Sequence, residues 1–460
     1  MFQLPCFVQD FLKTFKNNGF SIYIVGGAVR DLLMDRHLPE DKKNWDFATN
    51  ATPEEIIKLY PDGIYNNKYG TVTIPITIGD GDEKTIAIKQ YLFEITPFRK
   101  ESLYKDFRHP QKIEWAKTIE DDLARRDFTI NAIAYDGENI IDPFRGRKHI
   151  EEKLIVAVGQ PDLRFKEDAL RLMRAIRFSS QLGFLIEPKT LLSIQKNASL
   201  IQKISWERIR DEFLKILSSD NPAEGILFMR STGLLAFVLP ELDVCFVIPQ
   251  KSPKRHHIYD VGTHSVMALK SSPTRDPITR MAILLHDIGK APTFRRDEKT
   301  SLITFYNHEV VGEKLAINIA DRLKLSKKDK EKLVKLIRYH QFSVSELQTD
   351  KALRRFIREV GLEYLQDILD LRTADRIGSG AKPTSWRYEL FKKRLIEVQK
   401  EPFKITDLKI NGVDVMKELN LKPGPKVGKV LKTVFDEVVE GKLKNERSAL
   451  LKRIKELKLE

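Results

Sequence analysis

The chain has 460 residues, of which 42% are hydrophobic and 31% are charged, and its 79 basic and 65 acidic residues give a net charge of +14. This length predicts roughly two to four domains, and the composition is that of a soluble globular protein. No run of about eighteen apolar residues exists, and charges interrupt the N-terminal segment, so we expect no membrane span, no secretion signal and a cytoplasmic location.

The cysteines and the positive charge narrow the classes of site and partner. Cys6 and Cys245 lie far apart and fit no metal-ligand spacing, which excludes a disulfide framework and a thiolate zinc site. The basic excess suits a polyanionic partner, because neutralising phosphates releases counterions. Charge alone does not identify that partner.

Short strands and turns alternate through residues 20–145. We expect an α/β or α+β head domain there. Its predicted strands are residues 22–25, 45–48, 71–78, 85–95 and the strand-like stretch 128–134, with a Gly-Asp-Gly-Asp hairpin signal before the fourth.

A double glycine, Gly26-Gly27, separates the first predicted strand from a helix-like run at residues 28–33. Without a Cβ, these glycines let the backbone approach a ligand closely, and the N–H groups that open the next helix suit a phosphate. The alternative is a tight turn that binds nothing. Arg30 follows within the first helical turn and favours the phosphate site.

Two carboxylates on predicted strands are candidate metal ligands. Asp46 stands on the second hydrophobic stretch, and Glu94 ends a strand that we expect beside it. Clustered carboxylates of this kind hold Mg²⁺ together with substrate phosphates. With the double glycine they predict a nucleotidyl-transfer site.

The cluster Arg125-Arg126-Asp127 is the next candidate. Adjacent guanidinium groups are costly to bury unless they meet anions, so a triphosphate and a ribose are credible targets. The alternative is an exposed basic turn whose arginines pair with Asp121 and Asp122.

Beyond residue 165 nearly every segment has helical periodicity, broken by Gly, Pro and Ser-Ser. On a helix, Asp168 and Arg171 would project from one face as neighbours. A carboxylate beside a guanidinium fork can imitate the Watson–Crick edge of a base. The alternative is a surface salt bridge.

The order of these motifs resembles the class II tRNA nucleotidyltransferase and bacterial poly(A) polymerase family, over nearly the whole chain. The motifs are Gly26 to Asp31, Asn44-Trp45-Asp46, Arg125-Arg126-Asp127, Glu167-Asp168 with Arg171, and Glu207 to Arg210. The resemblance implies an α+β head of the polymerase-β-like nucleotidyltransferase fold, followed by all-helical neck, body and tail domains that hold the tRNA acceptor arm. The implied boundaries are residues 1–148, 149–247, 248–385 and 386–460.

The resemblance also implies roles for particular residues. Asp168 and Arg171 would read CTP and ATP without a nucleic-acid template, and the motif from Glu207 to Arg210 would brace the neck helix. The implied catalytic residues, with Mg²⁺, are Asn44, Asp46 and Glu94. The implied nucleotide-binding residues are Gly26, Gly27, Arg30, Arg125, Asp127, Asn131, Asp168, Arg171, Arg174 and Arg177.

Two segments favour the CCA-adding branch of the family. Residues 104–110 resemble the loop that helps to switch specificity from C to A, and the end of the chain resembles the tRNA-contacting tail, with Gly424-Pro425 and Gly428 at a helix start. We expect CCA addition to tRNA from CTP and ATP. The alternatives are an A-adding enzyme or poly(A) polymerase, and a tRNA-binding hydrolase with an inactive head.

Asn44 departs from the family pattern, which has Asp-x-Asp at the metal. An amide oxygen can bind Mg²⁺ but adds no negative charge, so we expect weakened transfer. Three explanations stay open. The substitution inactivates the enzyme on purpose, Glu94 compensates for it, or Asp41 substitutes despite a spacing that is wrong for one strand face.

A second candidate site lies in the helical half. His264, the adjacent His286-Asp287 and Asp375 follow the His, His-Asp, Asp order of the HD phosphohydrolase superfamily, which this segment resembles. Imidazole and carboxylate ligands on separate helices suit a divalent metal such as Mn²⁺, Ni²⁺ or Mg²⁺. His308 and His340 are candidates for a second metal or a phosphate, with helix capping or solvation as the alternative. We expect a monomer or weak dimer.

Overall fold

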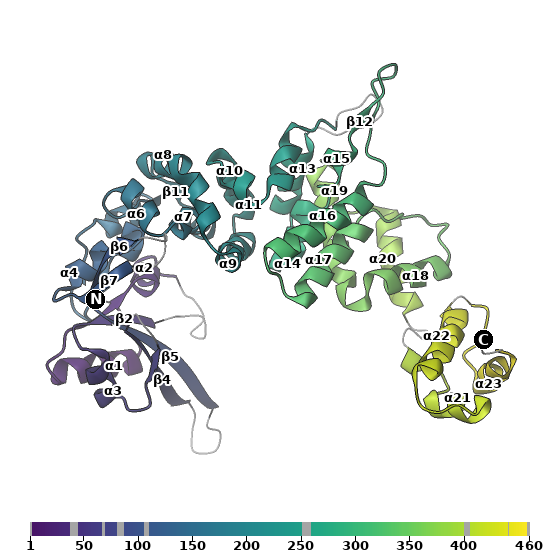
Figure 1. The fold of residues 1–460 in the computed structure, drawn as a ribbon, viewed down its shortest axis with the longest axis horizontal. Coiled ribbons are helices and arrows are strands. Elements are labelled where there is room, and N and C mark those ends of the chain that lie inside the picture. Colours follow the sequence, from purple (N-terminus) through teal and green to yellow (C-terminus); the bar gives the residue numbers. More distant parts are fainter. Residues whose placement is uncertain are drawn as a thin grey trace. The chain divides into compact units, whose positions relative to one another are not determined.

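The computed structural model describes residues 2–36, 45–66, 70–80, 87–104, 110–250, 259–399, 405–439 and 441–457. The chain divides into two compact units, Met1–Asp243 and Val244–Glu460. The first unit holds the main sheet with its helices, and the second is helical apart from one small hairpin (Figure 1). No helix in the described ranges has both the length and the apolar character needed to cross a membrane.

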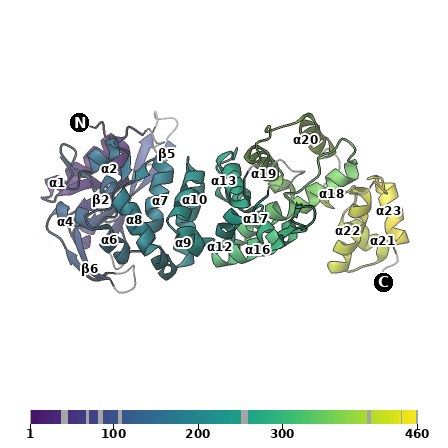
Figure 2. The same ribbon diagram turned by 90° about the horizontal axis from the view of Figure 1, so that it is seen from above.

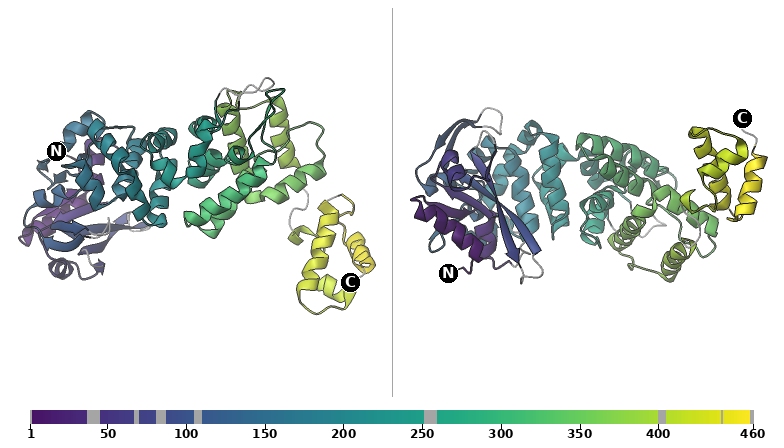
Figure 3. Two further views of the ribbon diagram at one scale, coloured as in Figure 1. Left: turned by 45° about the horizontal axis from the view of Figure 1, so that its top comes forward. Right: turned by 90° about the horizontal axis from the view of Figure 1, so that it is seen from below.

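A seven-stranded mixed sheet forms the centre of the first unit. Its strands are β1 (Ile22–Val25), β2 (Trp45–Thr49), β3 (Ile64–Asn66), β4 (Thr71–Asp80), β5 (Ala87–Pro97), β8 (Ala134–Tyr135) and β9 (Ile140–Ile141). They lie in the order β3-β4-β5-β2-β1-β8-β9, with β2 and β5 parallel and the other neighbours antiparallel. The strands β4 and β5 run side by side as a long pair (Figure 3).

Smaller strand pairs and short helices complete the head. The pairs are β6 (Arg99–Tyr104) with β7 (Pro110–Trp115), and β10 (Leu154–Ile155) with β11 (Leu185–Ile186). The helices are α1 (Cys6–Asn17), α2 (Gly27–Leu33), α3 (Pro53–Leu59), α4 (Ile119–Ala124) and α5 (Gly146–Glu151). α1 is amphipathic because Val8, Phe11, Leu12 and Phe15 recur at helical spacing, and all four are buried.

Successive side chains of β2 and β5 point to opposite faces of the sheet, so the apolar core lies on one face and the candidate metal ligands lie on the other. Phe47 and Phe93 are buried and pack against Phe11, with ring centroids 4.8 and 4.9 Å away. Asp46 and Glu94 are the intervening residues, so they point to the opposite face of the sheet. One face of these strands is therefore covered by α1, and the other carries the carboxylates.

Seven helices of the first unit follow the head. They are α6 (Pro161–Glu167), α7 (Leu170–Leu182), α8 (Pro188–Asn197), α9 (Trp206–Leu217), α10 (Pro222–Ser231), α11 (Leu234–Val238) and α12 (Pro240–Asp243). α7 packs against both α9 and α10 (Figure 2). Its buried residues run along nearly its whole length, as expected for a helix that lies between others.

The second unit is built from eleven described helices and one small hairpin, β12 (Arg295–Arg296) with β13 (Ile303–Thr304). The helices are α13 (Val261–Lys270), α14 (Pro277–Leu285), α15 (Lys290–Thr293), α16 (His308–Arg322), α17 (Lys327–Tyr339), α18 (Asp350–Val360), α19 (Leu365–Gly378), α20 (Trp386–Val398), α21 (Gly412–Leu419), α22 (Pro425–Val439) and α23 (Arg447–Glu456). α14 is buried from Ile278 to Leu285, and the last three helices share a separate apolar core.

The α+β head and the helical remainder confirm the predicted fold class. The strand expected at residues 128–134 is wrong, because Thr129–Asn131 form a 3-10 turn. Asp127 causes this turn, since its Oδ1 accepts hydrogen bonds from the Phe128 N–H at 2.8 Å and from Asn131 Nδ2 at 3.2 Å. The boundary between the two units lies close to the predicted neck-to-body boundary, and the four-domain division stays a prediction.

Candidate active site and metal centre

One cavity of the first unit gathers most of the predicted nucleotide site. Its volume is about 510 Å³, within the range of roughly 300–1,000 Å³ for small-molecule sites. Eight arginines and four aspartates line it, so its wall has an excess of positive charge that suits a polyphosphate. The predicted residues on the wall are Gly26, Gly27, Arg30, Asp46, Arg125, Asp127, Asn131, Asp168, Arg171, Arg174 and Arg177.

Gly26 is the residue of the double glycine that the geometry requires. Its φ is +70°, where an L side chain is strained, and a Cβ there would lie 3.1 Å from Arg126 Nη1 and 3.8 Å from Asp46 Oδ2. A Cβ on Gly27 would instead meet Arg30 Nη2 at 3.5 Å, which is an ordinary contact. Gly26 thus keeps the backbone close to a guanidinium and a carboxylate at the same time.

Arg30 is buried and held from several sides. Its Nη1 donates to Asn131 Oδ1 at 2.9 Å, and its Nε and Nη2 donate to Asp31 Oδ1 at 3.0 and 2.8 Å. Its guanidinium also lies over the Phe178 ring, 5.5 Å from the centroid. A cation fixed in this way is preorganised to meet an anion in the cavity.

Asp46 and Glu94 stand opposite each other in the register of β2 and β5. Asp46 lies on the cavity wall, and Glu94 is exposed beside it. Burial and the Glu94 carboxylate raise the pKa of Asp46 to about 6, although Arg126 opposes this rise. Since each carboxylate disfavours the charge of the other, the pair fits a divalent cation that stabilises both charges.

Three expectations about the head fall outside the described residues. They concern Asn44 at the first carboxylate position, Asp41 as its substitute, and residues 105–109 of the loop that resembles the specificity switch.

Arg125 and Arg126 share the buried carboxylate of Asp122. Arg125 Nη2 lies 2.7 Å from Asp122 Oδ1, and Arg126 Nη2 lies 3.0 Å from Asp122 Oδ2. Burial acts to raise the pKa of Asp122, but the two guanidinium groups outweigh burial and lower it. The predicted pairing with Asp122 occurs, yet the arginines form part of the cavity wall and not an exposed turn.

Asp127 connects the head to α7. Arg174 Nε donates to Asp127 Oδ2 at 2.7 Å, and the other oxygen holds Asn131, which in turn receives Arg30. Burial acts to raise the pKa of Asp127, but Arg174 and then Arg171 outweigh it and bring the pKa to about 2. A permanently charged Asp127 therefore fixes Arg174 on the cavity wall.

α7 presents a face to the cavity that the sequence revealed only in part. Arg171 and Arg174 were predicted, whereas Phe178 and Gln181 were not, although all four line the cavity. The sequence signal that could have found them is the helical spacing of three, four and three residues from Arg171 to Gln181. The ring of Phe178 lies 5.4 Å from the guanidinium carbon of Arg174 and 4.3 Å from that of Arg177. Arg126 of the predicted Arg125-Arg126-Asp127 cluster also lines the wall, as do Arg36 and Arg208, which were not predicted to bind the nucleotide.

Asp168 and Arg171 do not lie on one helix, so that expectation is wrong. Asp168 is extended, with φ −138° and ψ 106°, between α6 and α7, and its Oδ1 accepts a hydrogen bond from the Leu170 N–H at 3.0 Å. Asp168 thus lies outside both helices, and its carboxylate binds the N–H of the first residue of α7. Both residues still line the same cavity.

Each member of this pair has its own ionic partner. Asp168 Oδ2 accepts from Arg208 Nη2 at 2.9 Å. Arg171 Nη1 lies 2.6 Å from Glu167 Oε2, and its Nη2 donates to the Arg125 carbonyl oxygen at 2.9 Å. The pair is therefore two separately braced groups, an acceptor and a donor, on one wall.

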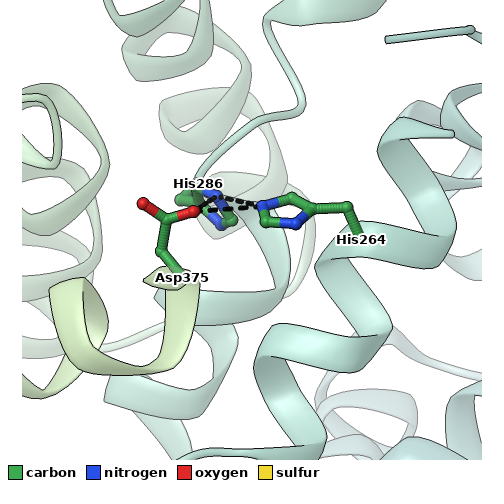
Figure 4. Close-up of side chains that lie close together, drawn as sticks. All are labelled: His264, His286 and Asp375. Atoms are coloured by element: carbon green, nitrogen blue, oxygen red, sulfur yellow. Dashed lines mark hydrogen bonds and ion pairs between the residues drawn. The ribbon is translucent and has the colours of Figure 1, made fainter. Parts of the chain in front are cut away.

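The second unit brings the predicted HD residues together from separate helices. His264 comes from α13, His286 from the end of α14 and Asp375 from α19, and their side chains converge (Figure 4). His264 Nε2 lies 3.2 Å from His286 Nε2 and 3.2 Å from Asp375 Oδ1. Asp287 Oδ2 adjoins them, 3.2 Å from His286 Nε2.

This donor set fits a divalent metal ion. His286 Nδ1 lies 2.7 Å from the Ile283 carbonyl oxygen, which can only accept, so the ring donates there and its Nε2 faces the centre. Burial acts to lower the pKa of His286, but Asp287 and Asp375 raise it to about 10, so the centre favours positive charge at this position. The described residues also contain a second such group, Asp287 with His308 and His340.

Known protein families match the part of the chain that forms the cavity and much of the helical remainder. Three family profiles match the chain: "Poly A polymerase head domain" at residues 22–156, "Probable RNA and SrmB- binding site of polymerase A" at residues 183–246, and "tRNA nucleotidyltransferase domain 2" at residues 295–454. Together the three profiles span most of both units.

Relatives match over nearly the full length. The CCA-adding enzyme of Lactococcus lactis subsp. lactis (strain IL1403) is 30% identical over 455 residues, 97% of this chain and 96% of the relative. The CCA-adding enzyme of Geobacillus stearothermophilus is 31% identical over 444 residues, 95% of this chain and 94% of the relative. The crystal structure of the Bacillus stearothermophilus CCA-adding enzyme in complex with CTP has a TM-score of 0.68 and 27% identity, across 98% of both chains.

These matches confirm the resemblance of the sequence motifs. Identity of 30% that extends over 97% of the chain is continuous from the head sheet to the last helices. The protein therefore belongs to the family of CCA-adding tRNA nucleotidyltransferases and poly(A) polymerases.

Proposed function

We propose that this protein adds C, C and A, from CTP and ATP, to the 3′ end of tRNA without a nucleic-acid template. The observation that carries the proposal is a single arginine-rich cavity shared by Asp46 and the pair Asp168 and Arg171. One wall offers a metal-binding carboxylate, and another offers an acceptor and a donor for a base. The full-length relatives named CCA-adding enzymes support C and A as the added nucleotides.

In this proposal Asp46 and Glu94 would hold Mg²⁺, and Asn44 occupies the first position of the family pattern Asp-x-Asp. The ion supplies charge neutralisation at the triphosphate and a Lewis acid near the primer's 3′-hydroxyl. Gly26 and Gly27 let the backbone approach the triphosphate, and Arg30 meets its charge. The remaining cations that face the triphosphate and ribose are Arg125, Arg174 and Arg177. Asp127 holds Arg174 in position, and Asn131 holds Arg30.

Base selection is assigned to Asp168 and Arg171. A carboxylate accepts a hydrogen bond from the amino group that cytosine and adenine share, and uracil has no such group. The guanidinium donates to ring acceptors. Because both side chains are held by protein partners, the pair reads the base with little reorganisation.

Product sequencing tests the proposal against its enzyme alternatives. A tRNA that ends at the discriminator base is incubated with CTP alone, with ATP alone and with both. We expect C addition with CTP, and complete CCA with both. An A-adding enzyme or poly(A) polymerase would extend with ATP alone, and a binding protein with an inactive head would extend with neither.

A second candidate function follows from the metal centre of the second unit. We propose that His264, His286, Asp287 and Asp375 bind a divalent ion such as Mn²⁺, Ni²⁺ or Mg²⁺ and support hydrolysis of a phosphoester. The observation that favours it is the convergence of these four side chains at ligand distances. Purified protein is assayed on a 2′,3′-cyclic phosphate with each ion. Hydrolysis that survives His286→Ala plus Asp287→Ala would exclude this centre.

A further inference from the structure

Phe178 lies among three arginines of the nucleotide cavity. The guanidinium carbon of Arg177 is 4.3 Å from the centroid of the ring, and those of Arg174 and Arg30 are at 5.4 and 5.5 Å. All three distances fall within the roughly 6 Å over which the face of an aromatic ring attracts a cation. All four side chains also line the cavity. One uncharged ring therefore interacts with three of the eight arginines on the wall.

The ring of Phe178 is itself fixed. It is 7% exposed and meets the ring of Phe128 edge-on, with the centroids 5.8 Å apart and an angle of 78° between the planes. This is a favourable arrangement for two aromatic rings. Phe128 is fully buried, and its N–H donates to Asp127 Oδ1 at 2.8 Å. Phe178 thus offers the arginines a surface that does not move with solvent.

Each of the three arginines also has a carboxylate partner. The partners are Asp31 for Arg30, Asp127 for Arg174 and Glu212 for Arg177. Arg177 Nε lies 3.0 Å from Glu212 Oε2, but this Nε makes no hydrogen bond within the part of the chain that the structure describes. The ring, at 4.3 Å, is therefore an important support for Arg177.

An aromatic ring can hold a cation without cancelling its charge. The face of the ring is negative because of its quadrupole, yet the ring has no net charge. A further carboxylate in this place would cancel one positive charge of the wall, and an aliphatic side chain would not attract the guanidinium groups. The eight arginines that line the cavity face only four aspartates there. A phenylalanine leaves this excess available to an anionic ligand.

We propose that Phe178 is a positioning residue of the nucleotide site, whose ring holds the three surrounding guanidinium groups where they meet the triphosphate of the incoming nucleotide. The proposal rests on the proposed function, which assigns a nucleoside triphosphate to this cavity. Cations that are already in place need little reorganisation when the ligand arrives. The ring acts through its attraction for these cations and not through its shape alone.

This role affects one part of the ligand and leaves the base unaffected. CTP and ATP share the triphosphate, so a weaker ring should weaken the binding of both by the same factor. Asp168 and Arg171 are held by other partners, at 2.9 Å from Arg208 and at 2.6 Å from Glu167. The preference between nucleotides should therefore stay unchanged.

Fluorination of the ring tests the proposal at nearly constant shape. In the full-length chain, Phe178 is replaced by phenylalanine that carries one, two or three ring fluorines, each of which weakens the attraction of the ring for a cation. Binding of CTP and of ATP is measured by calorimetry in the absence of tRNA. We expect the affinity for both nucleotides to fall in steps, by about tenfold in total. The affinity for tRNA and the unfolding temperature should change little.

The matched control is the same series at Phe213. This phenylalanine is fully buried on α9 and is not among the described residues that line the cavity. Its fluorination should leave the affinity for CTP and ATP unchanged. Phe178→Leu, which removes the ring and keeps an apolar side chain, should weaken the binding of both nucleotides at least as much as three fluorines.

Two results would overturn the proposal in distinguishable ways. Affinities that stay constant along the Phe178 series, while the parent binds CTP and ATP, would show that the ring does not act on the cations and would leave the proposed function intact. A parent that binds neither nucleotide would overturn the proposed function together with the role of Phe178. Stepwise loss of affinity in a parent that fails to extend tRNA would support the role of Phe178 and contradict the proposed function.

Discussion

Glu94 lies directly opposite Asp46 across the parallel pair of β2 and β5, so both carboxylates leave the same face of the head sheet. This relationship joins residues that are far apart in the chain. Burial raises the pKa of Asp46 to about 6, and the nearby charge of Glu94 adds to this rise. A divalent ion that neutralises both carboxylates turns this unfavourable pair into a binding site.

Removing the charge of Glu94 should reduce nucleotide addition. In Glu94→Gln we expect kcat to fall by about a hundredfold or more, equal to about 2.7 kcal/mol, because a carboxylate ligand is lost. Raising the Mg²⁺ concentration should restore part of the rate. Single-turnover extension of tRNA across a Mg²⁺ series measures both effects. A rate like that of the parent at low Mg²⁺ would show that Glu94 is not a ligand.

Asn44→Asp should increase the rate. The substitution restores the first aspartate of the family pattern Asp-x-Asp, and we expect kcat to rise at least about tenfold with a lower Mg²⁺ requirement. Extension of a tRNA that lacks CCA by the two proteins measures the change. Equal rates at every Mg²⁺ concentration would mean that another group already supplies the missing charge.

The pH profile should report Asp46. A carboxyl with a pKa raised to about 6 holds metal only when it is deprotonated, so activity is present above this pH and is lost as the pH falls through it. At limiting Mg²⁺ we expect kcat/KM to fall below a pH of about 6. More Mg²⁺ should move the midpoint lower, because the ion competes with the proton. A flat profile between pH 5 and 8 would contradict this assignment.

Local patterns in the sequence were enough to predict the elements that carry single motifs. The β-branched run of β1, the double glycine and the start of α2 were predicted because strand propensity and turn chemistry act within a few residues. The family order also predicted His264, His286, Asp287 and Asp375 as one group.

Relationships set by tertiary contacts were not predictable in the same way. Helical periodicity placed Asp168 inside a helix, but its hydrogen bond to the Leu170 N–H makes it the break between two helices. For His308 and His340 the sequence left open a metal or phosphate role or a capping role, because their closeness to Asp287 depends on how α16 and α17 pack. No sequence spacing encodes that contact.

Arg208 should act through Asp168 on the choice of base. Its Nη2 lies 2.9 Å from Asp168 Oδ2, so Arg208→Gln removes the ionic partner of this oxygen and leaves the Asp168 carboxylate held, among the described residues, only through Oδ1 by the Leu170 N–H. We expect discrimination against UTP to fall about tenfold, equal to about 1.4 kcal/mol, with a smaller change in kcat for CTP. Arg208→Lys should restore part of the discrimination.

The control for this prediction lies two residues further along the same helix. Arg210 pairs with Asp211 at the surface, so Arg210→Gln changes the same charge without touching Asp168. Incorporation of each nucleotide into one tRNA is compared between the two variants. Equal losses of discrimination would assign the effect to charge on α9 and not to Asp168.

Gly26→Ala should damage the nucleotide site more than Gly27→Ala. At Gly26 an alanine must adopt a φ of +70°, and its Cβ would lie 3.1 Å from Arg126 Nη1, whereas the Cβ at Gly27 makes an ordinary contact at 3.5 Å. The left-handed conformation costs an L residue about 1–2 kcal/mol, and the crowding moves Arg126 away from Asp46. We expect the KM for CTP and ATP to rise about tenfold in Gly26→Ala, with a smaller change in Gly27→Ala. Steady-state kinetics on one tRNA measure the two KM values, and thermal unfolding separates an effect on binding from an effect on stability. A larger effect at Gly27 would mean that the backbone of Gly27, and not that of Gly26, approaches the triphosphate more closely.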